Sequence, residues 1–283
     1  MNDTSFLTQT HVYFKKIFRI AMREKAWKFI IFAAIISFIV ASITGSDMYK
    51  DFDKTNSGFF TLTSACIWIG IFNSIQSICK EHEIIRAEYR QGMKISAYIT
   101  ANVQWQALLC LLQSVIIFGI CCVFMDFSKS THLLISPYLE NFITIYLLVF
   151  SASVLGIMVS SLSGTPTTAM TIMPFVLLVQ LIMCGVLFEL EGFTEGVSYI
   201  TLSKWGMNSF GSVADLNSYK LAINEPLHEA KVLVENYSAM PKPNDFYDHE
   251  VSRLLLSWLW IVGITFFNAV VSGIALKIKN RDS

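Results

Sequence analysis

Apolar and polar residues follow one another along this chain in long blocks. Six apolar segments stand out: Trp27–Thr44, Ser57–Cys79, Ile95–Phe124, Phe142–Ser163, Met170–Phe188 and Leu254–Leu276. At about 1.5 Å of rise per residue, a helix of roughly 18 or more residues crosses a hydrocarbon core of about 30 Å with modest tilt. The pattern therefore predicts an all-α membrane protein with six transmembrane helices.

The chain before the first apolar segment has a different period. Apolar residues recur there at helical spacing, and basic residues occupy the other side: Phe14, Ile17, Phe18, Ala21 and Met22 against Lys15, Lys16, Arg19 and Arg23. A helix of this kind lies in the membrane interface, with its basic side toward anionic head groups. We expect an N-terminal interfacial amphipathic helix.

A second polar block, residues 80–94 (KEHEIIRAEYRQGMK), separates the second and third apolar segments. It is longer than a minimal turn requires. We expect it to form a short helix at the membrane face, where a protein outside the membrane could push on it.

The distribution of Lys and Arg predicts the orientation. Basic residues cluster before the first segment, in residues 80–94 and after the last segment, whereas the loop after the first segment carries Asp47, Asp51 and Asp53. The positive-inside rule then places both termini in the cytoplasm.

The region before the last apolar segment is irregular. Pro166 suits a helix start, and Pro174 lies inside the fifth segment. Residues 194–216 are moderately apolar but interrupted by glycines, which favours a pair of half-inserted, re-entrant outer helices. A polar outer loop is expected over residues 217–250. The whole chain, residues 1–283, is interpreted as one transmembrane domain.

Composition agrees with a membrane protein. Of the 283 residues 54% are hydrophobic and 15% charged, and the mean hydropathy is +0.53. Soluble domains have about 25% charged residues. The formal net charge of zero gives no reason to expect a nucleic-acid partner. All six cysteines fall within apolar segments, so neither a disulfide framework nor a zinc site is expected.

The motifs of several enzyme classes are missing. The sequence has no G-x-x-x-x-G-K-[ST] phosphate-binding motif, and the apolar segments contain no Asp, Glu or His. An intramembrane metalloprotease or a proton relay would need such groups within the membrane. We therefore expect a chain that is not an enzyme and holds neither a metal nor a cofactor. The uncharged polar residues within the segments, among them Asn73, Gln76, Gln180 and Asn268, are interpreted as interhelical hydrogen-bonding groups.

Three stretches resemble one family. Residues 81–98, EHEIIRAEYRQGMKISAY, are similar to the coupling-helix pattern of type-2 ABC permeases of the ABCG/White type, with Glu81, Glu88, Gly92 and Tyr98 at the pattern positions. The sequence departs from the pattern at Ala87, where the family often has a basic residue or His; here Arg86 comes one place earlier. Residues 173–188 resemble the family's fifth span, and residues 199–211 resemble its second re-entrant half. In order, these matches cover most of residues 10–276.

The resemblance implies a set of partners and sites. Two such membrane domains would meet around a central cavity, with the second domain a copy or a paralogue of this chain, and separate ABC ATPase subunits would bind the ATP and Mg²⁺. Glu81, Arg86, Glu88 and Gly92 would belong to the coupling helix. Carried over by position, the substrate cavity would be lined by Leu62, Cys66, Ile69 and Asn73 of the second span, and by Leu178, Leu181, Ile182, Val186 and Leu187 of the fifth.

The resulting hypothesis is the permease subunit of an ATP-driven exporter in a bacterial plasma membrane. Because the candidate cavity face is mostly aliphatic, an amphipathic or apolar cargo such as a peptide, lipid or drug-like molecule is favoured. Two alternatives stay open at this point. One is a permease for a lipid-linked glycan, and the other is a non-transporting membrane scaffold or immunity protein.

Overall fold

The computed structural model describes residues 5–45, 47–127, 132–188, 190–218 and 247–281, and in these ranges it contains helices and no strand. The helices are α1 (Phe6–Arg23), α2 (Trp27–Thr44), α3 (Phe52–Ser74), the 3-10 turn η1 (Cys79–Glu81), α4 (His82–Arg90), α5 (Ile95–Phe124), α6 (Pro137–Leu162), α7 (Pro166–Ile182), α8 (Phe193–Ser198), α9 (Leu202–Val213) and α11 (Val251–Arg281). The predicted all-helical architecture is confirmed for these residues. The predicted polar outer loop lies mostly outside them.

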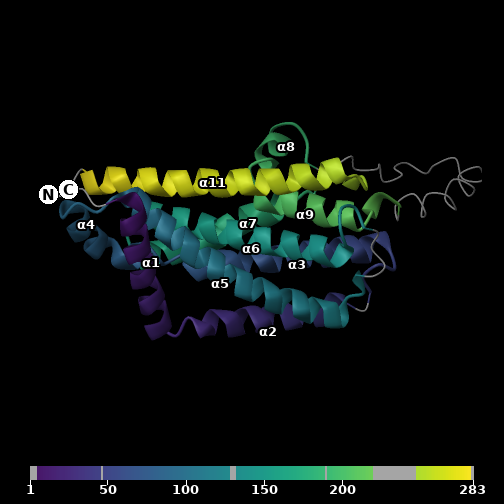
Figure 1. The fold of residues 1–283 in the computed structure, drawn as a ribbon. Helices are drawn as coiled ribbons and strands as arrows, with labels where there is room; N and C mark the ends of the chain where they lie inside the picture. The colour runs from purple at the N-terminus through teal and green to yellow at the C-terminus, as the bar shows by residue number, and fades with distance from the viewer. Residues whose placement is uncertain (1–4, 46, 128–131, 189, 219–246, 282–283) are drawn as a thin grey trace, which may run out of the picture.

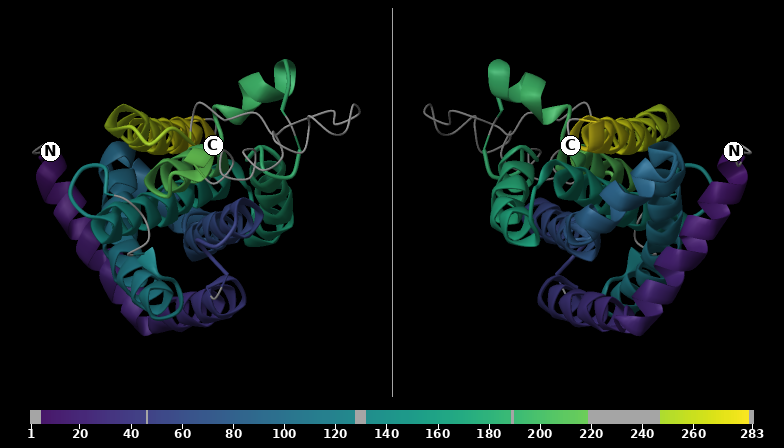
Figure 2. Two further views of the ribbon diagram at one scale, coloured as in Figure 1. Left: turned by 90° about the vertical axis from the view of Figure 1, so that its right-hand side faces the viewer. Right: turned by 90° about the vertical axis from the view of Figure 1, so that its left-hand side faces the viewer.

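The long helices run side by side, and α1 lies across them at one end of the bundle (Figure 1). The short helix α4 and the C-terminal end of α11 lie at this same end. An end-on view places α2 and α11 on opposite sides of the bundle (Figure 2). The charged helices α1 and α4 are therefore gathered at one end, as their polar sequences require.

Among the residues that the structure describes, five helices are long and apolar enough to cross a membrane: α2, α5, α6, α11 and the helix that begins at Phe52. The chain is thus a multi-pass membrane protein. The fifth predicted span is shorter than expected, because α7 has 17 residues and ends at Ile182. Gly185 follows in a left-handed conformation (φ +77°), which glycine tolerates best, and the chain turns there. The count of six spans stays a prediction.

The centre of the core is the contact between α3 and α6. A β-carbon at Gly70 would lie 2.3 Å from the carbonyl oxygen of Val149, and one at Gly156 would lie 2.2 Å from Oγ of Ser74. Ser74 Oγ donates to the carbonyl of Ser153 at 2.5 Å. Small residues on both helices thus let the two backbones approach closely, as in many membrane bundles.

The two short helices between α7 and α11 have different surroundings. Every residue of α9 is buried, and α9 packs against α3, α6 and α11. Helix α8 projects from the bundle (Figure 1), and Phe193 at its start is 85% exposed. The expected pair of short helices is present, whereas its insertion into the membrane stays a prediction.

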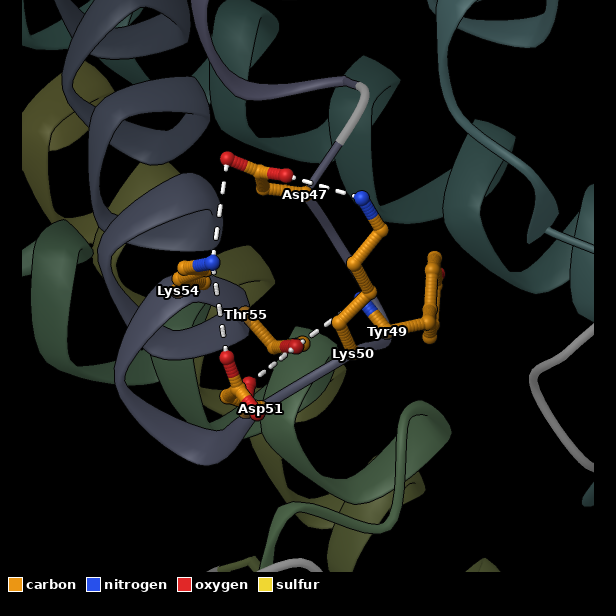
Figure 3. Close-up of polar contacts among 6 residues, drawn as sticks. All are labelled: Asp47, Tyr49, Lys50, Asp51, Lys54 and Thr55. Carbon is orange, nitrogen blue, oxygen red and sulfur yellow. Dashed lines mark hydrogen bonds and ion pairs between the residues drawn. The ribbon is translucent and has the colours of Figure 1, made fainter.

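The loop between α2 and α3 is held by charges of its own (Figure 3). Lys50 Nζ lies 2.9 Å from Oδ1 of Asp47, and Lys54 Nζ lies 3.5 Å from Oδ2 of Asp51. The hydrogen bond and charge of Lys50, aided by Lys54, lower the pKa of Asp47. Two of the three aspartates that made this loop look acidic, Asp47 and Asp51, are therefore paired with lysines within it.

Candidate functional site

The amphipathic helix α1 contacts α4 through an ion pair. Lys16 Nζ lies 2.6 Å from Oε1 of Glu88, and both side chains are about three-quarters buried, with 27% and 28% exposed. The apolar side of α1 packs on α5, where the ring of Phe18 meets that of Trp105 at 5.6 Å. This placement turns Lys16 toward α4. The apolar side of the amphipathic helix α1 thus packs on α5, and its basic side holds the charged helix α4.

A side-chain amide of α1 also bonds to the turn between α4 and α5. Gln9 Nε2 donates to the carbonyl of Gly92 at 3.4 Å, and Gln9 Oε1 accepts from the backbone N–H of Lys94 at 2.9 Å. Gly92 has φ +98°, a left-handed conformation in which helices commonly end. Of the four residues assigned to the coupling helix, Gly92 therefore lies just beyond α4 and terminates it.

Glu81 is tied to the start of α5. The buried Tyr98 hydroxyl donates to Oε2 of Glu81 at 3.1 Å. The ring of Tyr98 meets that of Tyr13 on α1 at 5.7 Å. Burial, and then the nearby Glu88 carboxylate, raise the pKa of Tyr13. The two glutamates singled out from the sequence thus face inward, toward α1 and α5.

The start of α4 lies near the end of α11. Lys279 Nζ donates to the carbonyls of Ser161, Leu162 and Ser163 at 2.7–2.9 Å, and so caps the C-terminus of α6. Burial, together with the positive charges of Lys279 and the half-buried Arg86, lowers the pKa of His82. Nε2 of His82 is buried without a hydrogen bond in the described structure. Protonation of His82 is therefore unfavourable here.

The outward side of α4 is formed by residues that were not assigned a role from the sequence. Glu83, Ala87 and Arg90 are exposed, and Ile84 beside them is 50% exposed. Ile85, by contrast, is fully buried. The sequence shows two adjacent isoleucines, Ile84 and Ile85, among charged residues. Only the structure shows that Ile84 is the one that faces outward.

A cavity of about 220 Å³ lies behind this junction, between α1, α2, α3 and α5. Four amide side chains contribute to its polar lining: Asn73, Gln76, Asn102 and Gln106. Three charged residues also line it, Glu24, Lys80 and Glu81, and Lys80 Nζ lies 4.0 Å from Oε2 of Glu24. The cavity thus combines polar and charged groups with apolar side chains such as Trp105, which suits an amphipathic molecule.

Asn73 is held by an amide pair. Its Nδ2 donates to Oε1 of Gln113 at 2.6 Å, and Nε2 of Gln113 donates back to Oδ1 of Asn73 at 3.1 Å. Nε2 of Gln113 also donates to the carbonyl of Phe29 at 3.0 Å. The pair therefore connects α2, α3 and α5, which agrees with the interpretation of such residues as interhelical hydrogen-bonding groups.

The other α3 residues assigned to the substrate cavity lie in the core of this chain. Leu62, Cys66 and Ile69 are at most 1% exposed. The exposed side of α3 carries Trp68, 49% exposed, with the partly exposed Phe72 one turn further. The assignment was sensitive to register, because one residue rotates a helix face by about 100°. A cavity role for the three buried residues stays a prediction.

The α7 residues are divided between two environments. Leu178 is 52% exposed, whereas Leu181 and Ile182 are partly buried. Val186 and Leu187 lie beyond the end of α7, and Leu187 is 52% exposed. Leu178 is therefore the α7 residue of this group that a second chain or a cargo can reach directly.

Comparison with known proteins agrees with the geometry. Residues 5–213 match the family model of the ABC-2 type transporter. The chain is also similar to the ABC transporter ATP-binding/permease protein Rv1747 of Mycobacterium tuberculosis, with 22% identity over 227 residues. That match covers 75% of this chain but only 26% of the longer protein. With the family match covering well over half of its length, the chain belongs to the ABC-2 type transporter membrane family and is a transmembrane permease component.

Proposed function

We propose that this chain is the membrane subunit of an ATP-driven exporter that moves an amphipathic or apolar cargo out of a bacterial cell. It would work with separate ABC ATPase subunits that bind ATP and Mg²⁺, and with a second membrane domain, either a copy or a paralogue. The observation that carries the proposal is the bracing of η1 and α4 by α1 and α5, with one side of α4 left exposed, in a member of a transporter family. Its charge distribution supports six spans and two cytoplasmic termini.

The exposed side of α4 is the proposed contact for the ATPase. Ile84 offers an apolar group at its centre, flanked by the charges of Glu83 and Arg90. Protein interfaces typically have an apolar centre with a charged rim. Glu88 is not part of this contact in the proposal, because Lys16 already occupies it.

A movement of α4 would be transmitted to α3, α5 and α1 through three connections. η1 and the preceding turn join α4 to α3, and backbone N–H groups of Ile78 and Cys79 in that turn both donate to Oγ of Ser160 at 3.1 Å. Gly92 joins α4 to α5, and Lys16 joins it to α1. These helices also line the cavity near Asn73. Movement of α4 would therefore change the shape of that cavity.

The cargo class rests on the exposed sides of α3 and α7. Leu178 and Phe175, 52% and 66% exposed, give α7 an apolar face. On α3, the exposed Trp68 and the partly exposed Phe72 favour a second candidate, a lipid-linked glycan, because sugar rings stack on aromatic side chains. The family resemblance had assigned other, mostly aliphatic residues of α3 to the cavity face and so gave less weight to that candidate.

The proposal is tested by reconstituting the full chain with candidate ABC ATPase subunits from the same genome. We expect a stable complex whose ATP hydrolysis requires both chains and drives export of a labelled amphipathic peptide or lipid from vesicles. Ile84→Glu should abolish complex formation, and Ile84→Leu should preserve it. Transport by this chain without any ATPase would overturn the proposal. Export of a lipid-linked glycan but not of the peptide or lipid would select the second candidate, and a stable complex with no transport would indicate a scaffold.

A further inference from the structure

A large apolar groove lies on the other side of α7, between α7, α11 and α6. Its volume is about 720 Å³, within the range of about 300–1,000 Å³ that small-molecule sites occupy. Leu155 and Met158 of α6 form its floor, and Ile200 and Leu202 close it beside α9. Leu259 and Phe267 of α11 line the groove and are 68% and 64% exposed. The groove is thus open to a molecule in the membrane.

One polar side chain in this groove lacks a partner. Asn268 is 3% exposed, and its Nδ2 is buried without a hydrogen bond in the described part of the chain. The other amide that lines the groove, Gln180, is engaged, because its Oε1 accepts from the backbone N–H groups of Leu202 and Ser203 at 2.9 and 3.2 Å. Buried amide groups are normally hydrogen-bonded. The unused donor of Asn268 therefore indicates a partner that the described residues do not supply.

The depth of Asn268 limits what that partner can be. It precedes Lys277 by nine residues on α11, which at 1.5 Å per residue places it about 14 Å into the membrane. A phospholipid head group does not lie at that depth, near the middle of a hydrocarbon core of about 30 Å. The groove lining also contains no Asp, Glu, Lys or Arg. The partner must therefore be mostly apolar and carry a hydrogen-bond acceptor within its apolar body or at its inner end.

We propose that this groove binds a lipophilic molecule of drug-like size, whose apolar body lies along Leu259 and Phe267 and whose single hydroxyl group accepts a hydrogen bond from Asn268. The terminal torsion of an asparagine side chain is broad, so its amide can turn toward a ligand in the groove. This site is separate from the cavity near Asn73. The inference does not rest on the ATP-driven export proposed above, and it can be tested without an ATPase.

The chain offers a matched pair of substitutions for the test. A β-carbon added at Gly263, which lines the groove, meets no atom within 4 Å, and the same holds at Gly273 on the same helix. Gly263→Phe should therefore fill the groove without a clash, and Gly273→Phe should place the same ring elsewhere on α11. Asn268→Leu removes the donor at similar volume.

The experiment is photolabelling of the full chain in phosphatidylcholine nanodiscs. The probes are a diazirine-bearing alkylphenol and the matched alkylbenzene that lacks the hydroxyl. We expect phenol adducts on the groove residues of α11 and α6, labelling reduced at least fivefold by Gly263→Phe, and unchanged labelling in Gly273→Phe. A single neutral hydrogen bond corresponds to about a three- to tenfold change. Asn268→Leu should therefore reduce phenol labelling by that factor and leave alkylbenzene labelling unchanged.

Two results would overturn the inference. Labelling of Gly263→Phe at the wild-type level would show that the groove is not the site, and equal phenol labelling in Asn268→Leu and wild type would remove the role of Asn268. If Asn268→Leu does not fold, competition on the wild-type chain replaces it. Unlabelled alkylphenol should then compete at least threefold better than the alkylbenzene, and equal competition would contradict the proposed hydrogen bond.

Discussion

Lys16 and Glu88 are 72 residues apart in the sequence, yet Lys16 Nζ lies 2.6 Å from Oε1 of Glu88. The pair joins the N-terminal amphipathic helix to the short helix between α3 and α5. The sequence assigned Glu88 to the coupling helix, and the structure pairs it with Lys16 of the N-terminal helix. Its role in this structure is to fix the position of α4.

The first prediction concerns this pair. Glu88→Ala should leave the chain folded but loosen α4 from α1, because this single ion pair lies near the surface, with 27% and 28% of its side chains exposed, and surface pairs contribute about 0–1 kcal/mol. In the complex with the ATPase, we expect ATP turnover to continue while transport falls. Lys16→Ala should have the same effect. The reversed pair, Lys16→Glu with Glu88→Lys, should restore transport. Wild-type transport in both alanine variants would contradict the bracing role, and so would a reversed pair that fails to restore transport.

A second prediction concerns the closest helix contact. Gly70→Ala places a β-carbon 2.3 Å from the carbonyl oxygen of Val149, so α3 and α6 must separate. Overpacking of this kind costs about 1–3 kcal/mol. Gly119→Ala on α5 is the control, because its β-carbon meets nothing within 4 Å and alanine favours a helix over glycine. Thermal unfolding in detergent should show a lower Tm for Gly70→Ala alone, and an equal Tm for both variants would disprove the tight contact.

The helices were predictable from the sequence because long apolar blocks are a strong signal. The bounds of α2 and α5 agree with the predicted segments Trp27–Thr44 and Ile95–Phe124. The fifth segment was predicted to end at Phe188, but α7 ends at Ile182. The sequence stays apolar beyond Ile182, so its hydrophobicity did not show where the helix ends. The positive φ of Gly185 is visible only in the structure.

The site was less predictable because helix faces depend on tertiary packing. All residues of a membrane helix can be apolar whichever side faces the core, so the sequence did not separate the buried Leu62, Cys66 and Ile69 from the exposed Trp68. Polar residues gave a clearer signal. Asn73 was interpreted as an interhelical hydrogen-bonding group, although its partner on α5 became known only from the structure.

A third prediction concerns pH. The pKa of His82 is lowered in the folded chain, first by burial and then by Lys279 and Arg86, so the folded state prefers the neutral ring. This contribution to stability is fully present above the unfolded pKa of about 6.5 and is lost as pH falls toward the lowered folded value. The Tm of the wild type should therefore fall more steeply than that of His82→Gln between about pH 7.5 and pH 5.5. Parallel pH profiles for the two proteins would contradict it.

The last prediction separates two roles for Asn73. If Asn73 mainly connects α3 to α5, then Asn73→Leu leaves the buried Oε1 of Gln113 without its donor, while Nε2 of Gln113 still donates to Phe29, and the chain is destabilised. Interhelical hydrogen bonds in membranes contribute about 0.6–2 kcal/mol. Gln113→Leu should cost a similar amount, and the double variant should regain part of the loss because no polar group is then stranded. If Asn73 instead serves mainly to contact cargo, both single variants should keep the wild-type Tm, and only Asn73→Leu should change transport. A double-mutant cycle on Tm, with transport measured on the same four proteins, decides between the two.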